Sequence, residues 1–189
     1  MESAEHIEPL NIGMIGAGFV GQLAHLANYV DIPECRVLGL AEVRPKLREL
    51  VSRRYDIPRA YARHGEMLED PDIEAVVVVT RRHHTGPIAL ECLRAGRHLL
   101  TEKPMAATLD QASTLVGAQQ PGTVYAVGSM RRHDEGVEMA RRILTELRET
   151  KELGEVLLVR LFCYGGQDYC KMPGFVDSGE PRPDDLPSW

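Results

Sequence analysis

The run Ala75–Thr80 (AVVVVT) limits the folds open to this chain more than any other segment. Its unbroken apolar and β-branched side chains suit a strand that is buried on both faces, because a half-exposed strand would alternate apolar with polar residues. Such strands occur chiefly in parallel sheets, and parallel neighbours need long crossover connections that are usually helices. The run therefore predicts an α/β fold with helices on both faces of a parallel sheet.

The segments around this strand alternate between strand-like and helix-like patterns. Apolar residues at helical spacing predict a helix over Phe19–Val30, Pro45 suits the first turn of another, and Thr108-x-x-Gln111 is a capping box for a helix ending near Ala118. The other expected strands are Leu10–Ile15, Arg36–Ala41, Ala60–Tyr61, Arg97–Thr101 and Thr123–Val127, and the other expected helices are Pro87–Ala95 and Glu135–Glu149. Six strands alternating with helices predict a doubly wound Rossmann-type sheet in a first domain, residues 1–150.

Composition indicates in which compartment the protein is found and which classes of partner it can bind. The 189 residues are 43% hydrophobic, enough for a globular core, and the net charge of −6 disfavours nucleic acid, whose phosphates favour basic surfaces. No stretch approaches the roughly 20 apolar residues of a membrane span, and Met1–Pro9 lacks the apolar run of a signal peptide. We therefore expect a cytoplasmic protein, in which the four cysteines are reduced. None of them forms a Cys-x-x-Cys pair, so we expect no metal site.

A glycine-rich turn follows the first expected strand and opens the first expected helix. Residues Gly16–Gly21 (GAGFVG) form the G-x-G-x-x-G pattern. Here Gly16 allows the tight turn, Gly18 lets the backbone approach a pyrophosphate, and Gly21 lets the helix pack closely on the strand. The pyrophosphate then lies at the helix N-terminus, where free N–H groups and the helix dipole favour anions. The expected dinucleotide contacts in this turn are Gly16, Gly18, Phe19, Val20 and Gly21.

Glu42 ends the second expected strand, 21 residues after Gly21. An acid at this place bonds the hydroxyls of the adenosine ribose, and its charge repels the 2′-phosphate of NADP(H). Arg44, two residues further on, could offset part of that repulsion. The predicted cofactor is therefore NAD(H), with NADP(H) less favoured and with Glu42 and Arg44 among the cofactor contacts; the alternative is that Glu42 is an exposed surface acid.

The fifth expected strand leads into Thr101–Pro104 (TEKP). In open parallel sheets, ligands bind beyond the carboxyl ends of the strands, so we expect Lys103 at the rim of the cofactor crevice. A lysine there can bond a substrate oxygen or take part in proton transfer, especially where burial lowers its pKa. On spacing alone, an ordinary surface Lys-Pro turn is an equal alternative.

Four features together resemble the Gfo/Idh/MocA oxidoreductase family, which includes glucose–fructose oxidoreductase and inositol dehydrogenase relatives. They are the glycine pattern, Glu42, Ala95–Pro104 (AGRHLLTEKP) and Gly128–Arg132 (GSMRR). The resemblance covers about residues 8–165. It implies a two-domain enzyme, a Rossmann half followed by a large open-sheet domain, that transfers hydride with NAD(P) at a hydroxyl or carbonyl of a sugar, cyclitol or nucleotide sugar.

The same resemblance implies roles for individual residues. Lys103 would lie near the nicotinamide and the reacting oxygen, as both catalytic residue and cofactor contact. Glu102 would support that loop, and Thr80 would line the cofactor crevice. The expected partner is a small molecule, a sugar or cyclitol.

The chain departs from the family pattern after the fourth strand. The family often has Thr-Pro-Asn-x-x-His there, whereas this chain has Thr80–Thr85 (TRRHHT). Counting back from the EKP run places Thr85 at the histidine position, so His84 takes that role and contacts the cofactor only if the loop shifts. The alternative is that His84 is an ordinary loop residue. The arginines that replace proline and asparagine, Arg81 and Arg82, either attract an anionic substrate or are solvated.

The pattern changes again in residues 151–189. Glu155–Tyr164 (EVLLVRLFCY) predicts a long strand, the first of a truncated α+β substrate or oligomerisation domain, and the Gly-, Pro- and Asp-rich remainder predicts an extended loop. Because a lone strand cannot form a sheet, it would pair with the first domain, with another subunit in a homo-oligomer, or with the rest of a longer protein. No histidine follows His133, although the family's second domain usually supplies an acid and a histidine for proton transfer.

Two other functions stay open at this point. The chain could be a non-catalytic NAD(H)-binding module or fragment that acts as a sensor or assembly subunit. A weaker reading is a Rossmann domain for another adenosine ligand such as S-adenosylmethionine, against which the EKP run argues.

Overall fold

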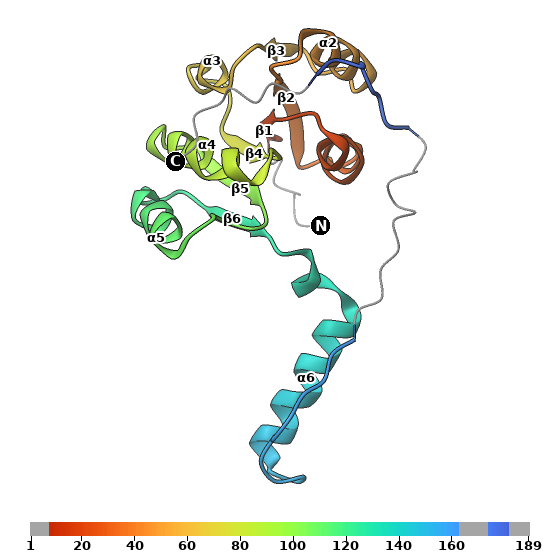
Figure 1. Cartoon of the computed structure of the whole chain (residues 1–189), viewed down its shortest axis with the longest axis vertical. Coiled ribbons are helices and arrows are strands. Elements are labelled where there is room, and N and C mark those ends of the chain that lie inside the picture. The colour runs from red at the N-terminus through yellow and green to blue at the C-terminus, as the bar shows by residue number, and fades with distance from the viewer. Residues whose placement is uncertain (1–7, 163–173, 182–189) are drawn as a thin grey trace, which may run out of the picture. The chain divides into compact units, whose positions relative to one another are not determined.

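The computed structural model describes residues 8–162 and 174–181 of the chain. The described residues fall into two units, one formed by residues up to 128 together with 174–181, and the other by residues 129–162. The first unit contains a sheet with helices on both faces, and the second contains one long helix followed by an extended segment (Figure 1). The prediction of domains at 1–150 and 151–189 stays a prediction.

The first unit is built on a sheet of six strands in the order β3-β2-β1-β4-β5-β6. The strands are β1 (Leu10–Ile15), β2 (Cys35–Ala41), β3 (Arg59–Tyr61), β4 (Ala75–Val78), β5 (His98–Glu102) and β6 (Tyr125–Gly128). All five neighbouring pairs are parallel. This is the doubly wound Rossmann order, which confirms the predicted fold class, and the strand order reverses between β1 and β4.

The sheet is covered by helices η1 (Gly21–Leu26, a π-helix), α1 (Ala27–Tyr29), α2 (Pro45–Arg54), α3 (His64–Leu68), α4 (Arg82–Arg94) and α5 (Leu109–Ala118). Thr108 caps α5 as predicted, because its side chain accepts from the Gln111 backbone N–H. The Gln111 side chain returns to the Ala107 N–H, one residue before the N–H group used in a standard capping box. In the part of the chain that the structure describes, no helix is both long enough and apolar enough to cross a membrane.

Three helical segments differ from the sequence-based expectation. The helix after the glycine turn is wound as a π-helix, which apolar spacing does not distinguish from an α-helix. Helix α3 was not predicted, since five residues are too few to show periodicity. Helix α4 begins at Arg82 rather than Pro87, so the proline lies inside the helix and His84 and Thr85 are helical rather than loop residues. The start of the helix was predicted at Pro87 because proline is most frequent in the first turn of a helix, and that prediction was wrong.

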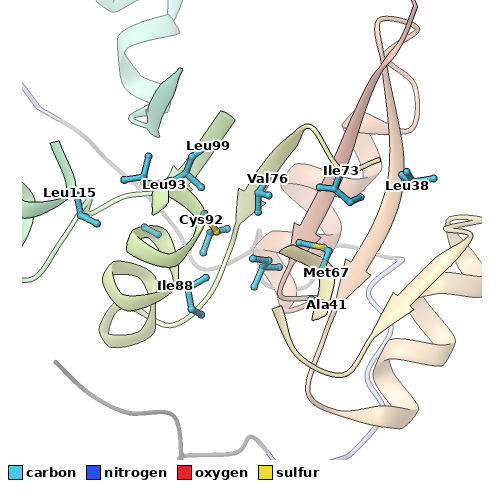
Figure 2. Packing of buried hydrophobic residues seen from close by; sticks show 13 residues of the cluster. Leu38, Ala41, Met67, Ile73, Val76, Ile88, Cys92, Leu93, Leu99 and Leu115 are labelled. Atoms are coloured by element: carbon cyan, nitrogen blue, oxygen red, sulfur yellow. The ribbon is translucent and has the colours of Figure 1, made fainter. Parts of the chain in front are cut away.

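Buried side chains form one cluster on each face of the sheet. One cluster joins the strands to α3, α4 and α5 through residues such as Met67, Leu93 and Leu115 (Figure 2). The other joins them to η1 and α2 through Leu26, Leu47 and Val51. β4 supplies Val76 and Val78 to the first cluster and Ala75 and Val77 to the second. Its apolar run is thus buried on both faces, as its sequence predicts.

A segment from the far end of the chain, residues 174–181, packs on this unit. Val176 packs against the η1/α2 cluster. The carboxamide of Gln22, which has no exposed surface, donates to the Val176 carbonyl at 3.0 Å and accepts from its N–H at 2.9 Å. The ring of Phe175 lies 5.5 Å from that of Phe19, between centroids. Residues 174–181 therefore belong to the Rossmann unit although they are more than 40 residues beyond β6.

The second unit contains a 3-10 turn, Met130–His133, and the helix α6, Glu135–Thr150. Asp134 caps α6 by accepting from the N–H groups of Gly136 and Val137. The predicted strand Glu155–Tyr164 does not form over residues 155–162, and its last two residues lie outside the described part of the chain. The segment instead runs along α6, where Val156 and Val159 border a cavity with Ala140 and Leu144 (Figure 1). An extended segment without a partner strand has no backbone ladder to make, so it is not a β-strand.

Candidate functional site

The Rossmann unit contains a pocket with a volume of about 290 Å³. It lies where the carboxyl ends of β1, β2 and β4 meet, the place where ligands bind in open α/β sheets. Nine of the residues expected to contact the cofactor line it: Gly16, Gly18, Phe19, Val20, Gly21, Glu42, Arg44, Thr80 and His84. Four separate sequence segments, from the ends of three strands and the start of α4, thus meet at one cavity.

The three glycines of the turn have different surroundings. Gly16 has φ +95, and a Cβ atom there would meet the Val79 carbonyl oxygen at 2.3 Å. At Gly21 a Cβ atom would lie 2.6 Å from the Gly16 carbonyl oxygen, because the helix crosses the turn closely. At Gly18 no atom lies within 4 Å of that position. Gly16 and Gly21 are therefore required by the protein's own backbone, whereas Gly18 leaves open space toward the pocket.

Glu42 is buried, with 5% of its surface exposed, at the end of β2. One carboxylate oxygen accepts from the Ala17 N–H at 2.9 Å and from Arg44 Nη2 at 3.0 Å. The other accepts from the Arg44 N–H at 3.1 Å and from Arg44 Nε at 2.8 Å. Burial would raise the pKa of Glu42, but the hydrogen bonds from Arg44 and Ala17 outweigh it and hold the pKa below its usual value. Glu42 is therefore a charged acceptor inside the pocket, not an exposed surface acid.

Two polar side chains from the start of α4 and the end of β4 complete the wall of the pocket. His84 has 4% of its surface exposed, and its ring lies 3.9 Å from that of His83, between centroids. The Thr80 hydroxyl lies 3.2 Å from that of Thr85, which also hydrogen-bonds to the Arg81 carbonyl. The early start of α4 carries His84 into the pocket without any shift of a loop.

Glu102 and Lys103 are not among the residues that line this pocket. Glu102 ends β5, and one of its carboxylate oxygens lies 2.9 Å from Nε2 of His25 on η1. The other oxygen accepts from the Lys103 N–H at 3.2 Å. Lys103 itself is exposed. The EKP turn is thus tied to the helix of the glycine turn through His25, while the lysine side chain is left at the surface.

Sequence reasoning missed His64 and His25. His64 lines the pocket from α3, and its Nε2 atom lies 2.8 Å from a carboxylate oxygen of Glu91. His25 lies one turn beyond the glycine pattern, and its position on η1 was the one available signal. Within residues 8–162 and 174–181, no group of three or more His, Cys, Asp or Glu side chains is arranged to hold a metal ion.

Comparison with known proteins places this geometry in a family. Residues 10–129 match the model of the Gfo/Idh/MocA family, an oxidoreductase family with an NAD-binding Rossmann fold. The chain belongs to this family. The resemblance inferred from the glycine pattern, Glu42 and the EKP run is therefore confirmed.

Two relatives with named activities are about 30% identical to this chain over the aligned residues. The levoglucosan dehydrogenase of Pseudarthrobacter phenanthrenivorans is 29% identical over 150 residues, 74% of this chain and 38% of that protein. The inositol 2-dehydrogenase/D-chiro-inositol 3-dehydrogenase of Lacticaseibacillus casei is 30% identical over 155 residues, 80% of this chain and 43% of that protein. This chain therefore spans less than half the length of these relatives.

Two solved structures carry ligands. A levoglucosan dehydrogenase in complex with NADH superposes with a TM-score of 0.69 at 28% identity, over 74% of this chain and 40% of that one. A myo-inositol dehydrogenase from Lactobacillus casei, in complex with NAD(H) and myo-inositol, superposes with a TM-score of 0.70 at 28% identity, over 74% of this chain and 42% of that one.

Proposed function

We propose that this chain is the cofactor-binding part of an NAD-dependent dehydrogenase or reductase that acts on a sugar or cyclitol. The observation that carries the proposal is the pocket at the strand order reversal, which is lined by both the glycine turn and Glu42. When bound there, the nicotinamide cofactor supplies the hydride-transfer chemistry, and the protein supplies binding and orientation. Small-molecule substrates of this class are those named for the levoglucosan and inositol dehydrogenase relatives.

The residues present fit a dinucleotide. The open space at Gly18 lets a pyrophosphate approach the backbone at the start of η1. Glu42 already accepts four hydrogen bonds, which fills its acceptor capacity. The two bonds from the Arg44 guanidinium are the ones that ribose hydroxyls can replace, because the Ala17 and Arg44 N–H groups belong to the backbone and hold the carboxylate in place. Arg44 would then be free of Glu42 once the adenosine ribose is bound.

The proposed roles beyond this pocket concern the EKP turn. The ion pair between His25 and Glu102 joins the EKP turn to η1, and Lys103 follows Glu102 directly in the chain. Lys103 holds or moves the proton of the reacting hydroxyl at its Nζ atom. Thr80 and His84 contact the cofactor from the wall of the pocket. With the acidic composition, we further propose a cytoplasmic protein, with homo-oligomers as the assembly and neither nucleic acid nor membrane as partner.

A titration of the 189-residue chain with NADH, followed by cofactor fluorescence, tests the proposal. Gly18→Ala is the informative variant, because the added methyl group meets nothing in the protein but occupies the path of the pyrophosphate. We expect NADH affinity to fall by about tenfold or more, ~1.4 kcal/mol, with little change in the melting temperature. Gly117→Ala in α5 is the matched control, since its Cβ also meets nothing within 4 Å. Absence of saturable NADH binding by the unmodified chain, or equal binding by Gly18→Ala, would contradict the proposed site.

A further inference from the structure

The region around Arg44 has the two features that attract a phosphate group. One is a guanidinium, whose planar fork pairs with phosphate oxygens. The other is the N-terminus of α2, which begins at Pro45 directly after Arg44 and whose first N–H groups have no acceptor within the helix. The extra 2′-phosphate of NADP(H) is carried by the adenosine ribose, the group that we place at Glu42. A Rossmann domain with only these features would therefore be open to NADP(H).

Both features are satisfied by carboxylates of the chain itself. The guanidinium of Arg44 donates to Glu42 through Nε at 2.8 Å and Nη2 at 3.0 Å. The N–H groups of Lys46 and Leu47, in the first turn of α2, donate to the two carboxylate oxygens of Glu180 at 3.1 and 2.8 Å. Glu42 is two residues from Arg44, but Glu180 comes from more than 130 residues along the chain.

The segment that carries Glu180 is fixed in place by other contacts. Gln22 makes a pair of hydrogen bonds with the Val176 backbone, and Phe175 lies against Phe19. The side chain of Asp177 accepts from the Gly179 N–H at 3.0 Å, and Ser178, which is buried, accepts from the Glu180 N–H at 3.3 Å. These contacts hold Glu180 at the start of α2, and Asp177 lies three residues before it in the same segment.

Both acids also act on Arg44. Hydrogen bonding to Glu42 raises the pKa of the Arg44 guanidinium against the opposing effect of burial, and the charges of Glu180 and Asp177 raise it further. When ribose hydroxyls displace Arg44 from Glu42, these two carboxylates are the negative charges toward which its guanidinium can turn. They repel a phosphate at the same place, because like charges near a protein surface interact more strongly than in bulk water.

We infer that residues 174–181 form part of the adenosine end of the site and that Glu180, with Asp177, selects NAD(H) against NADP(H). Glu180 occupies the anion-attracting N-terminus of α2, and together with Asp177 it holds Arg44 away from the 2′-position of the ribose. The inference rests on the proposed location of the cofactor. It adds that selection comes from a segment outside the βαβ units as well as from Glu42.

Dissociation constants for NADH and NADPH, measured side by side on the 189-residue chain, test the inference. Glu180→Gln removes the charge but keeps an acceptor oxygen for α2, and Glu180→Ala also frees the Lys46 and Leu47 N–H groups. We expect NADPH to bind roughly threefold to tenfold more tightly to Glu180→Gln, and more tightly again to Glu180→Ala, with NADH affinity unchanged. Asp177→Asn should act in the same direction with a smaller effect.

Glu74→Gln is the matched control. Glu74 is an exposed acid that accepts a backbone N–H, that of Asn11 at 2.9 Å, but it lies at the amino ends of the strands, opposite the pocket. The net charge changes equally, so an equal gain in NADPH affinity there would overturn the inference. It would also be overturned if folded Glu180→Gln bound NADPH no better than the unmodified chain, or gained equally for both cofactors. If the unmodified chain bound neither cofactor, the proposed function itself would fail. That result differs from the outcomes above, which overturn only the role of Glu180.

Discussion

The Rossmann unit and residues 129–162 contain similar proportions of apolar side chains but differ in how far these side chains are buried. In the first, apolar residues of each face of the sheet are buried by helices, and residues such as Met14, Leu40 and Leu93 have no exposed surface. In the second, not one of the described residues is buried, and Leu157 and Leu161 are 93% and 86% exposed. Exposed apolar side chains of this density are unusual on a protein surface unless another element or molecule covers them.

The difference in burial follows from whether each region finds its packing partners within the described residues. The first unit is complete within the described residues because every strand has a neighbour and both faces have helices. Residues 129–162 have the apolar pattern of a strand and an amphipathic helix but no sheet to join. The levoglucosan and inositol dehydrogenase relatives are more than twice as long as the segment that matches this chain.

The largest effect is expected from a leucine truncation made once in each region. Leu93→Ala removes a side chain with no exposed surface from the α4 cluster, so we expect a loss of about 2–5 kcal/mol in the free energy of unfolding. Leu157→Ala removes a side chain that is 93% exposed and should change it by less than about 0.5 kcal/mol. Urea denaturation followed by circular dichroism measures both. Similar losses for the two variants would mean that the second region is packed after all.

A smaller effect is expected from the buried charge of the Rossmann unit. The pKa of Glu42 is lower in the folded chain than its ordinary value of 4.5, so its charged form stabilises the fold above that pH. This stabilisation is lost as the pH falls below 4.5 and through the folded pKa. Glu42→Gln leaves the half-buried Arg44 without its charged partner and turns one acceptor oxygen into an amide donor, so we expect a loss of roughly 1–3 kcal/mol at neutral pH.

The pH dependence separates this effect from simple loss of packing. The unfolding free energies of Glu42→Gln and of the unmodified chain should approach each other as the pH is lowered from 5, because the Glu42 carboxyl then takes up a proton more readily in the unfolded chain than in the folded one. Glu146→Gln, on the exposed surface of α6, is the control and should follow the unmodified chain at every pH. A constant difference between Glu42→Gln and the unmodified chain across this range would contradict a lowered pKa.

Most of the Rossmann unit was predictable because its signals are local. The valines of β4, the glycine turn and the capping box at Thr108 each act through neighbours in sequence, and each prediction is confirmed as an element of the fold. Glu42 was found because its distance from the glycine turn is set by one βαβ unit. The start of α4 was misplaced, since Pro87 is tolerated within the helix by the surrounding packing.

The contacts that sequence reasoning could not supply are those between distant segments. Nothing in the local pattern places Glu180 on α2 or His25 on Glu102. Likewise, the apolar run at residues 155–162 resembles a strand, but whether it becomes one depends on a partner strand rather than on its own residues. The pairing of Arg44 with Glu42 was also missed, although the two lie only two residues apart, because an ion pair depends on which way each side chain turns.

The smallest expected effect comes from removing one helix cap in each region. Thr108 caps α5, which is packed on the sheet, and Asp134 caps α6. Either cap contributes about 1 kcal/mol to its own helix. Because α5 contributes the fully buried Leu115 to the core, Thr108→Ala should lower the free energy of unfolding of the whole Rossmann unit by about that amount.

Asp134→Ala should instead increase amide hydrogen exchange in the first turn of α6 and leave the unfolding of the sheet and the NADH affinity unchanged. A loss of NADH affinity or of sheet stability in Asp134→Ala would show that the two regions are energetically coupled, and the contrast between a self-sufficient unit and a dependent one would then have to be abandoned.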